Sequence, residues 1–225
     1  MLNQHHSNGI LFIDKPKGIT SYDVIRVLKR KLKVKKIGHA GTLDPLATGL
    51  LIVGIGRATK RLKEFMDLPK TYYMEVLLGI KTVTGDLDGQ VIEQKEVSEI
   101  DEAQLKKTIL DMEGEIELPV PSYSAVKHKG IPLYKYARKG IKIEEKLRRT
   151  RIFYLKLLDV LKDSPQIVLK MEMKCSKGTY ARALGEELGR RLSIPTTLKE
   201  VRRLKIGEFD LSQAETLESC TNERN

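Results

Sequence analysis

The sequence predicts an α+β fold, and two observations carry that prediction. Predicted strands and helices follow one another along the 225 residues without the strand–helix–strand rhythm of a doubly wound parallel sheet. Residues 167–175 alternate strictly between apolar and polar side chains, which is typical of a strand with one buried face. A chain of this length can bury roughly 70% of its unfolded surface, so it needs neither disulfides nor metal ions to hold a core.

The N-terminal third predicts several elements from its apolar pattern and its turn residues. They are a short buried strand over residues 10–13, a turn over 14–18, a helix from Ser21 to about Lys33, a buried strand over 50–55 and a helix over 57–67. Ser21 is predicted to cap its helix, because a serine hydroxyl can accept a hydrogen bond from a free backbone N–H group. Residues 38–49 fit neither helix nor strand periodicity and predict a shaped loop.

The remainder of the chain predicts a further series of strands and helices. They are a strand over residues 72–78, a helix opened by the capping pair Ser98 and Asp101 and ending near Met112, the alternating strand over 167–175, a helix over about 179–192 and a last strand over about 201–209. Proline at position 195 ends the fourth of these elements, because proline cannot continue a helix.

The charge is basic and unevenly distributed. Lys and Arg number 41 against 30 Asp and Glu, a net charge of +11, which favours an acidic partner such as a phosphate backbone. Residues 85–117 hold 11 acidic and 3 basic residues, a net of −8, so the rest of the chain carries +11 − (−8) = +19. Residues 118–151 hold 10 Lys and Arg against 2 Glu, interleaved with Tyr123, Tyr134 and Tyr136. Aromatic side chains among cations suit RNA, because they can stack on splayed bases, although the tyrosines are equally explained as core-edge residues.

A second basic run closes the helix predicted from Ser21. Its members are Arg26, Lys29, Arg30, Lys31, Lys33, Lys35 and Lys36. Cations near the C-terminus of a helix complement the helix dipole, so this run is equally explained as a solvated face.

Several classes of protein are excluded. Cys175 and Cys220 lie far apart without a CxxC spacing, which predicts neither a metal site nor a disulfide framework and fits a reducing cytoplasm. Residues 1–8, with His5 and His6, predict a frayed N-terminal tail. No apolar segment approaches the ~20 residues of a membrane-spanning helix, and the N-terminus lacks the apolar stretch of a signal peptide.

The loop over residues 38–49 is the most informative segment. Asp44 stands in a glycine-rich stretch directly before Pro45. Proline moves the preceding residue away from helical geometry and removes a backbone donor from its surroundings. Taken alone, the residue type and spacing favour a turn aspartate that bonds its own loop.

Five ordered segments, covering about residues 9–215, resemble motifs of the TruB family of tRNA pseudouridine synthases. They are residues 9–21 (Gly9 to Ser21), residues 38–49 with Leu43-Asp44-Pro45-Leu46-Ala47-Thr48-Gly49, Lys70-Thr71-Tyr72, residues 121–138 from Pro121-Ser122-Tyr123 to Ala137-Arg138, and Cys175-Ser176-Lys177-Gly178-Thr179-Tyr180-Ala181-Arg182 followed by Arg202-Arg203. Five motifs in order are far more specific than any one of them.

The resemblance implies a fold, a substrate and a reaction. The fold would be a mixed, mainly antiparallel sheet with flanking helices and a central basic cleft. The reaction would convert uridine-55 in the T loop of tRNA to pseudouridine, which requires no cofactor and no metal. Asp44 would be catalytic, either attacking the anomeric carbon or removing a ribose proton. Arg182 would pair with Asp44 and favour its charged form.

The resemblance also implies a substrate-binding set. Tyr72 would stack on the uracil after it leaves the RNA helix, a step that costs a few kcal/mol. Tyr180 would lie near the base and exchange a hydrogen bond with it. His39 would help to hold the displaced RNA loop open, and Val201 falls where the family has a substrate-contacting leucine. Taken alone, His39 is more often a loop-packing histidine, and each tyrosine a core residue.

Two further features concern the subtype and the domains. Leu46 and Ala47 follow Pro45, where the guide-RNA-dependent archaeal and eukaryotic synthases have Lys-Val, so the stand-alone bacterial type is the better match. We therefore expect a monomer that binds the tRNA T stem-loop with neither guide RNA nor membrane. The expected domains are a tail over 1–8, a catalytic domain over 9–215 and a tail over 216–225 without a PUA domain. From this organisation we expect weaker tRNA binding.

Glu117 and Val120 depart from the family pattern around the segment from 121, which puts the local loop contacts in doubt.

Two alternative functions stay open. A non-catalytic RNA-binding or tRNA-folding protein would explain the charge and the aromatics. It would leave one set of residues without a shared reason: Asp44, Tyr72, Tyr180 and Arg182. A pseudouridine synthase for another RNA would keep the same site.

Overall fold

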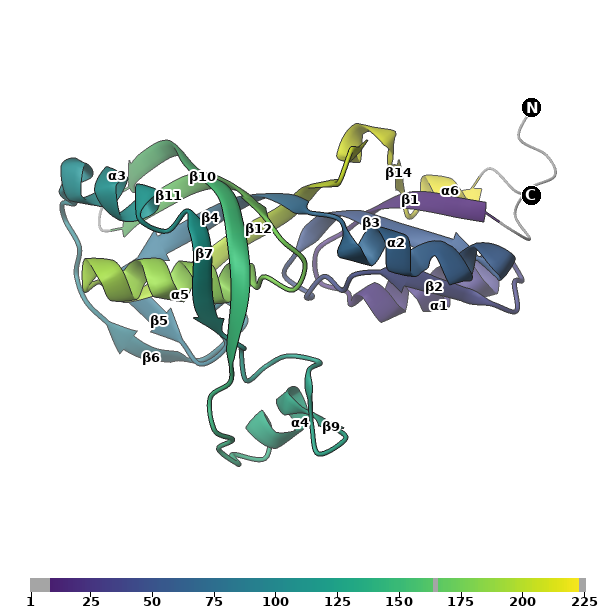
Figure 1. The fold of residues 1–225 in the computed structure, drawn as a ribbon, viewed down its shortest axis with the longest axis horizontal. Coiled ribbons are helices and arrows are strands. Elements are labelled where there is room, and N and C mark those ends of the chain that lie inside the picture. The colour runs from purple at the N-terminus through teal and green to yellow at the C-terminus, as the bar shows by residue number, and fades with distance from the viewer. Residues whose placement is uncertain (1–8, 164–165, 223–225) are drawn as a thin grey trace. The chain divides into compact units, whose positions relative to one another are not determined.

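The computed structural model describes residues 9–163 and 166–222, so the tail predicted over residues 1–8 lies outside the described residues. The chain divides into two compact units (Figure 1). Unit 1 comprises Met1–Tyr73 and Val201–Asn225, and unit 2 comprises Met74–Glu200. Strands β4 (Lys70–Leu78) and β12 (Thr196–Ile206) each contain residues of both units.

Strand β3 (Thr48–Ile55) organises the sheet of unit 1. Strand β1 (Gly9–Lys15) runs antiparallel to it along its whole length, from Gly9 opposite Ile55 to Lys15 opposite Gly49. Strand β2 (Ile37–Ala40) is antiparallel to the second half of β3, and β12 is parallel to its first two residues. The unit is completed by β13 (Phe209–Asp210) beside β12, η2 (Leu211–Gln213), β14 (Glu215–Thr216) parallel to β1, and α6 (Ser219–Asn222).

Helices cover both faces of β3. Successive side chains of a strand point to opposite faces, so Leu51 and Val53 pack against α1 (Ser21–Lys31). Leu50 and Ile52 pack on the other side against α2 (Leu62–Asp67), which follows the 3₁₀ helix η1 (Gly56–Arg61). Each fully buried aliphatic side chain contributes about 1.5–3 kcal/mol to folding, which explains why this double-faced strand is a continuous apolar run.

Unit 2 is built on a sheet in the order β12, β4, β11, β10, β7. Its elements not yet named are β5 (Ile80–Thr82), β6 (Val91–Gln94), α3 (Glu102–Leu110), β7 (Gly114–Pro119), β8 (Lys127–His128), β9 (Ile131–Pro132), α4 (Leu133–Ala137), β10 (Leu147–Asp163), β11 (Gln166–Cys175) and α5 (Ala181–Leu192). Helix α5 packs closely on β12 at Gly189, since a Cβ atom there would lie 2.3 Å from the Thr196 hydroxyl.

The structure confirms the predicted α+β fold with a mixed, mainly antiparallel sheet. The pair β1–β14 and the pair β3–β12 are parallel, whereas β1–β3, β2–β3, β7–β10 and β10–β11 are antiparallel. The alternating strand is β11, although Val168, expected on the polar face, is buried with the others. The long strand β10 was not predicted.

Three local predictions were wrong in detail. The N-cap of α1 is Thr20, whose hydroxyl accepts from the backbone N–H of Asp23 while the Asp23 carboxylate accepts from that of Thr20. The predicted loop over 38–49 is shorter, because its first residues pair with β3 as strand β2. The segment expected as a tail from residue 216 contributes to β14 and α6, and Cys220 lies in the core of unit 1.

Helix α3 begins differently from the predicted capping pair. The Asp101 carboxylate alone accepts from Ala103 and Gln104, while Ser98 is exposed in a segment without regular structure. In the described part of the chain, no helix combines the length and the apolar character that crossing a membrane would require.

We expect Asp101→Ala to lower the free energy of unfolding by about 1 kcal/mol, because two N–H groups at the start of α3 lose their acceptor. Urea unfolding of both variants measures this, with Ser98→Ala as the matched control that changes little. Equal losses in the two variants would contradict the assignment of Asp101 as the only side-chain cap.

Candidate active site

The residues predicted for the site fall into two sets, one in each unit. Unit 1 contributes His39 from β2, Asp44 from the loop between β2 and β3, Tyr72 from β4 and Val201 from β12. Tyr180 and Arg182 lie in unit 2, at the start of α5. Their roles, and the pairing of Asp44 with Arg182, stay predictions.

Residues on both sides of Asp44 hold its loop in place. Leu43 and Leu46 are buried, and the buried hydroxyl of Ser21 accepts a 2.8 Å hydrogen bond from the Leu43 N–H and donates to the Leu43 carbonyl at 3.0 Å. The carbonyl of Pro45 accepts a 2.8 Å hydrogen bond from the Gly18 N–H. Asp44 itself is half-buried between these anchors.

Lys15 is a buried cation beneath this loop. Its Nζ donates to the carbonyls of Pro16 at 2.8 Å, Ile19 at 2.6 Å and Pro45 at 3.5 Å, and the residue has no exposed surface. Burial lowers the pKa of Lys15 to about 8, and the neighbouring Asp44 carboxylate opposes that shift. The lysine therefore links the segment after β1 to the residue that follows Asp44, and it is still mainly charged at neutral pH.

Arg203 holds the two ends of the same loop. Its Nε donates to the Leu50 carbonyl at 2.7 Å and its Nη2 to the Gly41 carbonyl at 3.1 Å, and only 1% of the residue is exposed. Gly49 has a φ of +100°, and a Cβ there would lie 2.3 Å from the Arg203 carbonyl oxygen. Only glycine allows β12 to approach this closely, so the arginine can reach both loop ends.

The other site residues of unit 1 differ in exposure. His39 and Tyr72 are half-buried, whereas Val201 is buried on β12. Burial lowers the pKa of His39, the nearby Arg203 lowers it further, and the backbone of Gly41 opposes both. His39 is therefore neutral at pH 7 and able to donate one hydrogen bond and accept another.

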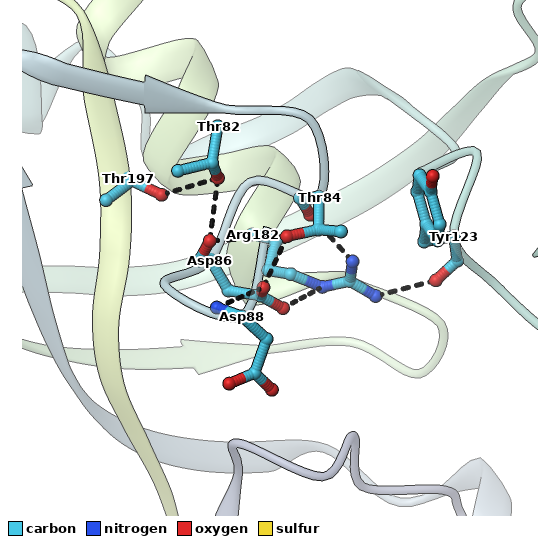
Figure 2. A network of polar contacts seen from close by, with 7 residues as sticks. All are labelled: Thr82, Thr84, Asp86, Asp88, Tyr123, Arg182 and Thr197. Carbon is cyan, nitrogen blue, oxygen red and sulfur yellow. Dashed lines mark hydrogen bonds and ion pairs between the residues drawn. The ribbon is translucent and has the colours of Figure 1, made fainter. Parts of the chain in front are cut away.

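Arg182 is the centre of a polar network in unit 2 (Figure 2). Its Nη1 donates to the Thr84 carbonyl at 2.7 Å and its Nη2 to the Tyr123 carbonyl at 2.9 Å. The Nε lies 3.7 Å from the Asp86 carboxylate, and both side chains are buried. One guanidinium thus joins three segments: the start of α5, the loop after β5 and the segment after β7.

Asp86 is a component of this network that sequence reasoning missed. Its carboxylate accepts from the Thr84 hydroxyl at 2.5 Å and from the Asp88 N–H at 3.2 Å, while its carbonyl accepts from Thr82 (Figure 2). The sequence offered no signal, because Asp86 stands among turn residues within the acidic stretch 85–117. Lys15 and Arg203 were also missed as site residues, although both lie in segments that carry the family resemblance.

Tyr180 stands at the N-cap of α5 in an extended conformation, and its side chain is half-buried. The guanidinium of Arg148 lies over its ring, 6.0 Å from the centroid. A guanidinium over the face of an aromatic ring is attracted by the electrons of that ring, and this attraction favours the observed position of the ring. The ring is therefore held while remaining partly accessible.

The basic segment from 121 to 146 forms a projection in unit 2. Figure 1 shows β9 and α4 standing apart from the sheet of that unit. Arg138 lies over the Tyr134 ring at 5.4 Å, and Tyr136 donates to the His128 carbonyl. A cavity of about 870 Å³ lies against this segment, and neither Tyr180 nor Arg182 lines it. None of the other predicted site residues lines this cavity either.

No group of three or more His, Cys, Asp or Glu side chains within residues 9–163 and 166–222 is arranged to hold a metal ion.

Comparison with known proteins defines the class as pseudouridylate synthase. A family model described as TruB family pseudouridylate synthase (N terminal domain) matches residues 29–181, more than half of the chain. The chain belongs to the TruB family. A protein of Endomicrobium trichonymphae called tRNA pseudouridine synthase B is 44% identical over 95% of this chain and 92% of its own length. A protein of Carboxydothermus hydrogenoformans with the same name is 41% identical over 93% of this chain and 73% of its own length.

Solved structures agree on the fold. The archaeal box H/ACA sRNP Nop10–Cbf5 complex contains a chain that is 25% identical and superposes with a TM-score of 0.69, over 97% of this chain. A Cbf5–Nop10–Gar1 complex gives 25% identity and a TM-score of 0.70 over 95%. The present chain spans 54% of the matched chain in each case, about half of its length.

Because the pKa of Lys15 is lowered in the folded protein, we expect the free energy of unfolding to rise with pH. Its pKa is about 8 in the folded protein against an ordinary 10.5, so between these values the unfolded chain binds more protons than the folded one. Stability therefore increases on going from pH 7.5 to 9.5, and Lys15 accounts for about 2 kcal/mol of the increase. Urea unfolding at both pH values should show that Lys15→Met loses this part of the rise. The same rise in wild type and variant would refute a depressed pKa.

Asp86→Asn is expected to destabilise unit 2 by on the order of 2 kcal/mol or more, because it removes a buried anionic partner of Arg182. Asp88→Asn, an exposed aspartate two residues away, is the matched control and should change stability by less than about 0.5 kcal/mol. Denaturant unfolding compares them. Similar small effects for both would mean that the Asp86 charge contributes nothing to the network.

Proposed function

We propose that this protein converts uridine-55 in the T loop of tRNA to pseudouridine. The observation that carries the proposal is the half-buried Asp44, set on a loop that is anchored at Gly41, Leu43 and Pro45, in a chain of the TruB family. Relatives called tRNA pseudouridine synthase B, which match nearly the whole chain, support tRNA as the substrate.

The reaction is an isomerisation, so atoms and electrons balance without a co-reactant. The bond from the ribose C1′ to the base nitrogen breaks, and C1′ rejoins the same base through carbon. Asp44 acts on the sugar, either by attacking C1′ or by removing a ribose proton. Both routes use the carboxylate of Asp44 rather than the carboxylic acid.

The anchored loop supplies what this chemistry needs most, which is position. An error of about 1 Å in the position of a reacting group can cost about 100-fold in rate. The hydrogen bonds from Ser21, Lys15 and Arg203 hold the backbone on both sides of Asp44, so little conformational freedom is left to lose when the nucleotide arrives.

The remaining site residues receive, bind and orient the extruded nucleotide. Tyr72 stacks on the uracil, Tyr180 exchanges a hydrogen bond with it, and His39 holds the displaced RNA loop open. Val201 gives apolar packing against the substrate. The half-burial of both tyrosines and of His39 supports these roles, because a stacking surface must be both supported and accessible.

Arg182 is assigned to the substrate-binding set, as the cation predicted to act with Asp44. The support for this role is its fixed geometry: two carbonyls and the Asp86 carboxylate orient the guanidinium within unit 2. An arginine held in this way keeps its planar donors pre-organised for a carboxylate.

RNA binding is assigned to the basic projection over residues 121–146, whose cations and tyrosines suit a folded RNA loop. We further propose that the protein acts as a cytoplasmic monomer without a guide RNA. The sequence from Leu43 to Gly49 supports this, because it matches the stand-alone type of synthase and not the guide-dependent type.

Asp44→Asn is expected to abolish pseudouridine formation while tRNA binding and folding persist, because the amide keeps the shape but can neither attack C1′ nor accept a proton. Carbodiimide labelling followed by reverse transcription reads the modification as a stop at uridine-55. Asp159→Asn, which changes an exposed aspartate on β10, is the control and should retain full activity.

A normal stop at that uridine with Asp44→Asn would contradict the proposal. Binding without turnover by the wild-type protein would favour a non-catalytic RNA-binding or tRNA-folding protein. Turnover on an RNA other than tRNA, mapped by sequencing in a deletion strain, would identify a synthase for a different substrate.

A further inference from the structure

The C-terminal end of α1 carries a surface that the proposed reaction does not use. We name it the basic block, and its members are Lys29, Arg30, Lys31, Lys33, Lys35 and Lys36. All six side chains are exposed. Within the described ranges none of them forms an ion pair with a carboxylate, whereas the nearby Arg26 pairs with Asp23 at 2.5 Å and Arg61 with Glu64 at 3.3 Å.

The helix dipole explains only part of the basic block. Lys29, Arg30 and Lys31 lie in the last turn of α1, where cations complement the dipole. The other three members follow the helix, which ends at Lys31, and two of them stand directly before β2. The dipole effect falls off beyond the last turn. The helix dipole therefore does not offset the repulsion that Lys33, Lys35 and Lys36 add.

The basic block lies at the end of unit 1 opposite to Asp44. Gly9 and Ile37 both pair with Ile55 at one end of the sheet, and the Lys36 carbonyl accepts from the Gly56 N–H there. Lys15 pairs with Gly49 at the other end, beside the Asp44 loop. A seven-residue strand such as β1 spans about 20 Å, which sets the distance between the two ends.

A polyanion fits this surface better than a lipid membrane does. Membrane-surface helices offer a large apolar face to lipid next to their cations. The apolar residues of α1, Val24, Ile25 and Leu28, are already buried in the core of unit 1, and Leu32 packs against the same core. The basic block therefore offers charge without an apolar surface to insert.

We propose that the basic block binds phosphates of the substrate RNA outside the loop that contains the target uridine. The proposal rests on the function proposed above, and it assigns RNA contacts to a second surface besides the projection over 121–146. RNA that places a uridine at Asp44 must extend about 20 Å along unit 1 to reach these cations, which is longer than a stem of three base pairs.

The test replaces Lys33, Lys35 and Lys36 by glutamine together, leaving α1 intact. The matched control is Lys95→Gln, Lys106→Gln and Lys107→Gln, three exposed cations of the acidic stretch that give the same change in net charge. Binding is measured for whole tRNA and for a T-loop hairpin whose stem has three base pairs, each over a series of salt concentrations. Single-turnover rates are measured at saturating tRNA.

We expect the first variant to bind whole tRNA roughly tenfold more weakly, with a salt slope of log K reduced by about 2. Its affinity for the short hairpin should match wild type, because a stem of three base pairs is too short to contact the basic block. Its rate at saturating tRNA should also match wild type, because the basic block lies far from Asp44. The control variant should behave like wild type throughout.

Three outcomes would overturn the inference: unchanged affinity and salt slope for whole tRNA, equal losses in both triple variants, or equal losses on the hairpin and whole tRNA. Loss of binding to vesicles of anionic lipid, with tRNA binding unchanged, would overturn it in favour of a membrane. Wild-type protein that binds but never modifies tRNA would instead refute the proposed function, and the affinity series would still test the basic block.

Discussion

Two buried cations bonded to backbone carbonyls fix the geometry on which the site of unit 1 depends. Lys15 reaches the carbonyl of Pro45, and Arg203 reaches the carbonyls of Gly41 and Leu50. Burying a charge is costly unless hydrogen bonds replace its water, and here the bonds to Pro45 and Gly41 also restrain the loop. The same side chains therefore shape the backbone around Asp44 and place positive potential near its carboxylate.

The two units use this principle in different ways. In unit 1 the charged groups bind carbonyls of a loop and leave the carboxylate half-exposed. In unit 2 the charged group is itself the expected functional side chain, and Arg182 is oriented by Thr84, Tyr123 and Asp86. Side chains with several rotatable bonds become precise only when their surroundings satisfy most of their donors.

Much of the fold could be predicted, because hydrophobic periodicity reports burial directly. The buried run of β3 and the alternation of β11 were both visible in the sequence. The N-cap at Thr20 was missed by one residue, since the Ser21 hydroxyl that suggested a cap instead bonds Leu43. The prediction that Asp44 is catalytic came only from its motif. Asp86 could not be found, because its partner Arg182 is 96 positions further on, and no local pattern encodes such a contact.

The dependence of the Asp44 loop on Arg203 also affects how the protein matures during synthesis. The arginine bonds carbonyls 153 and 162 positions earlier in the chain. Ribosomes add about 5–20 residues per second, so roughly 10–30 s pass between the synthesis of the loop and the synthesis of Arg203. Nascent chains that end before β12 therefore contain Asp44 without the hydrogen bonds from Arg203. The loop takes its final conformation only when β12 pairs with β3 beside Gly49.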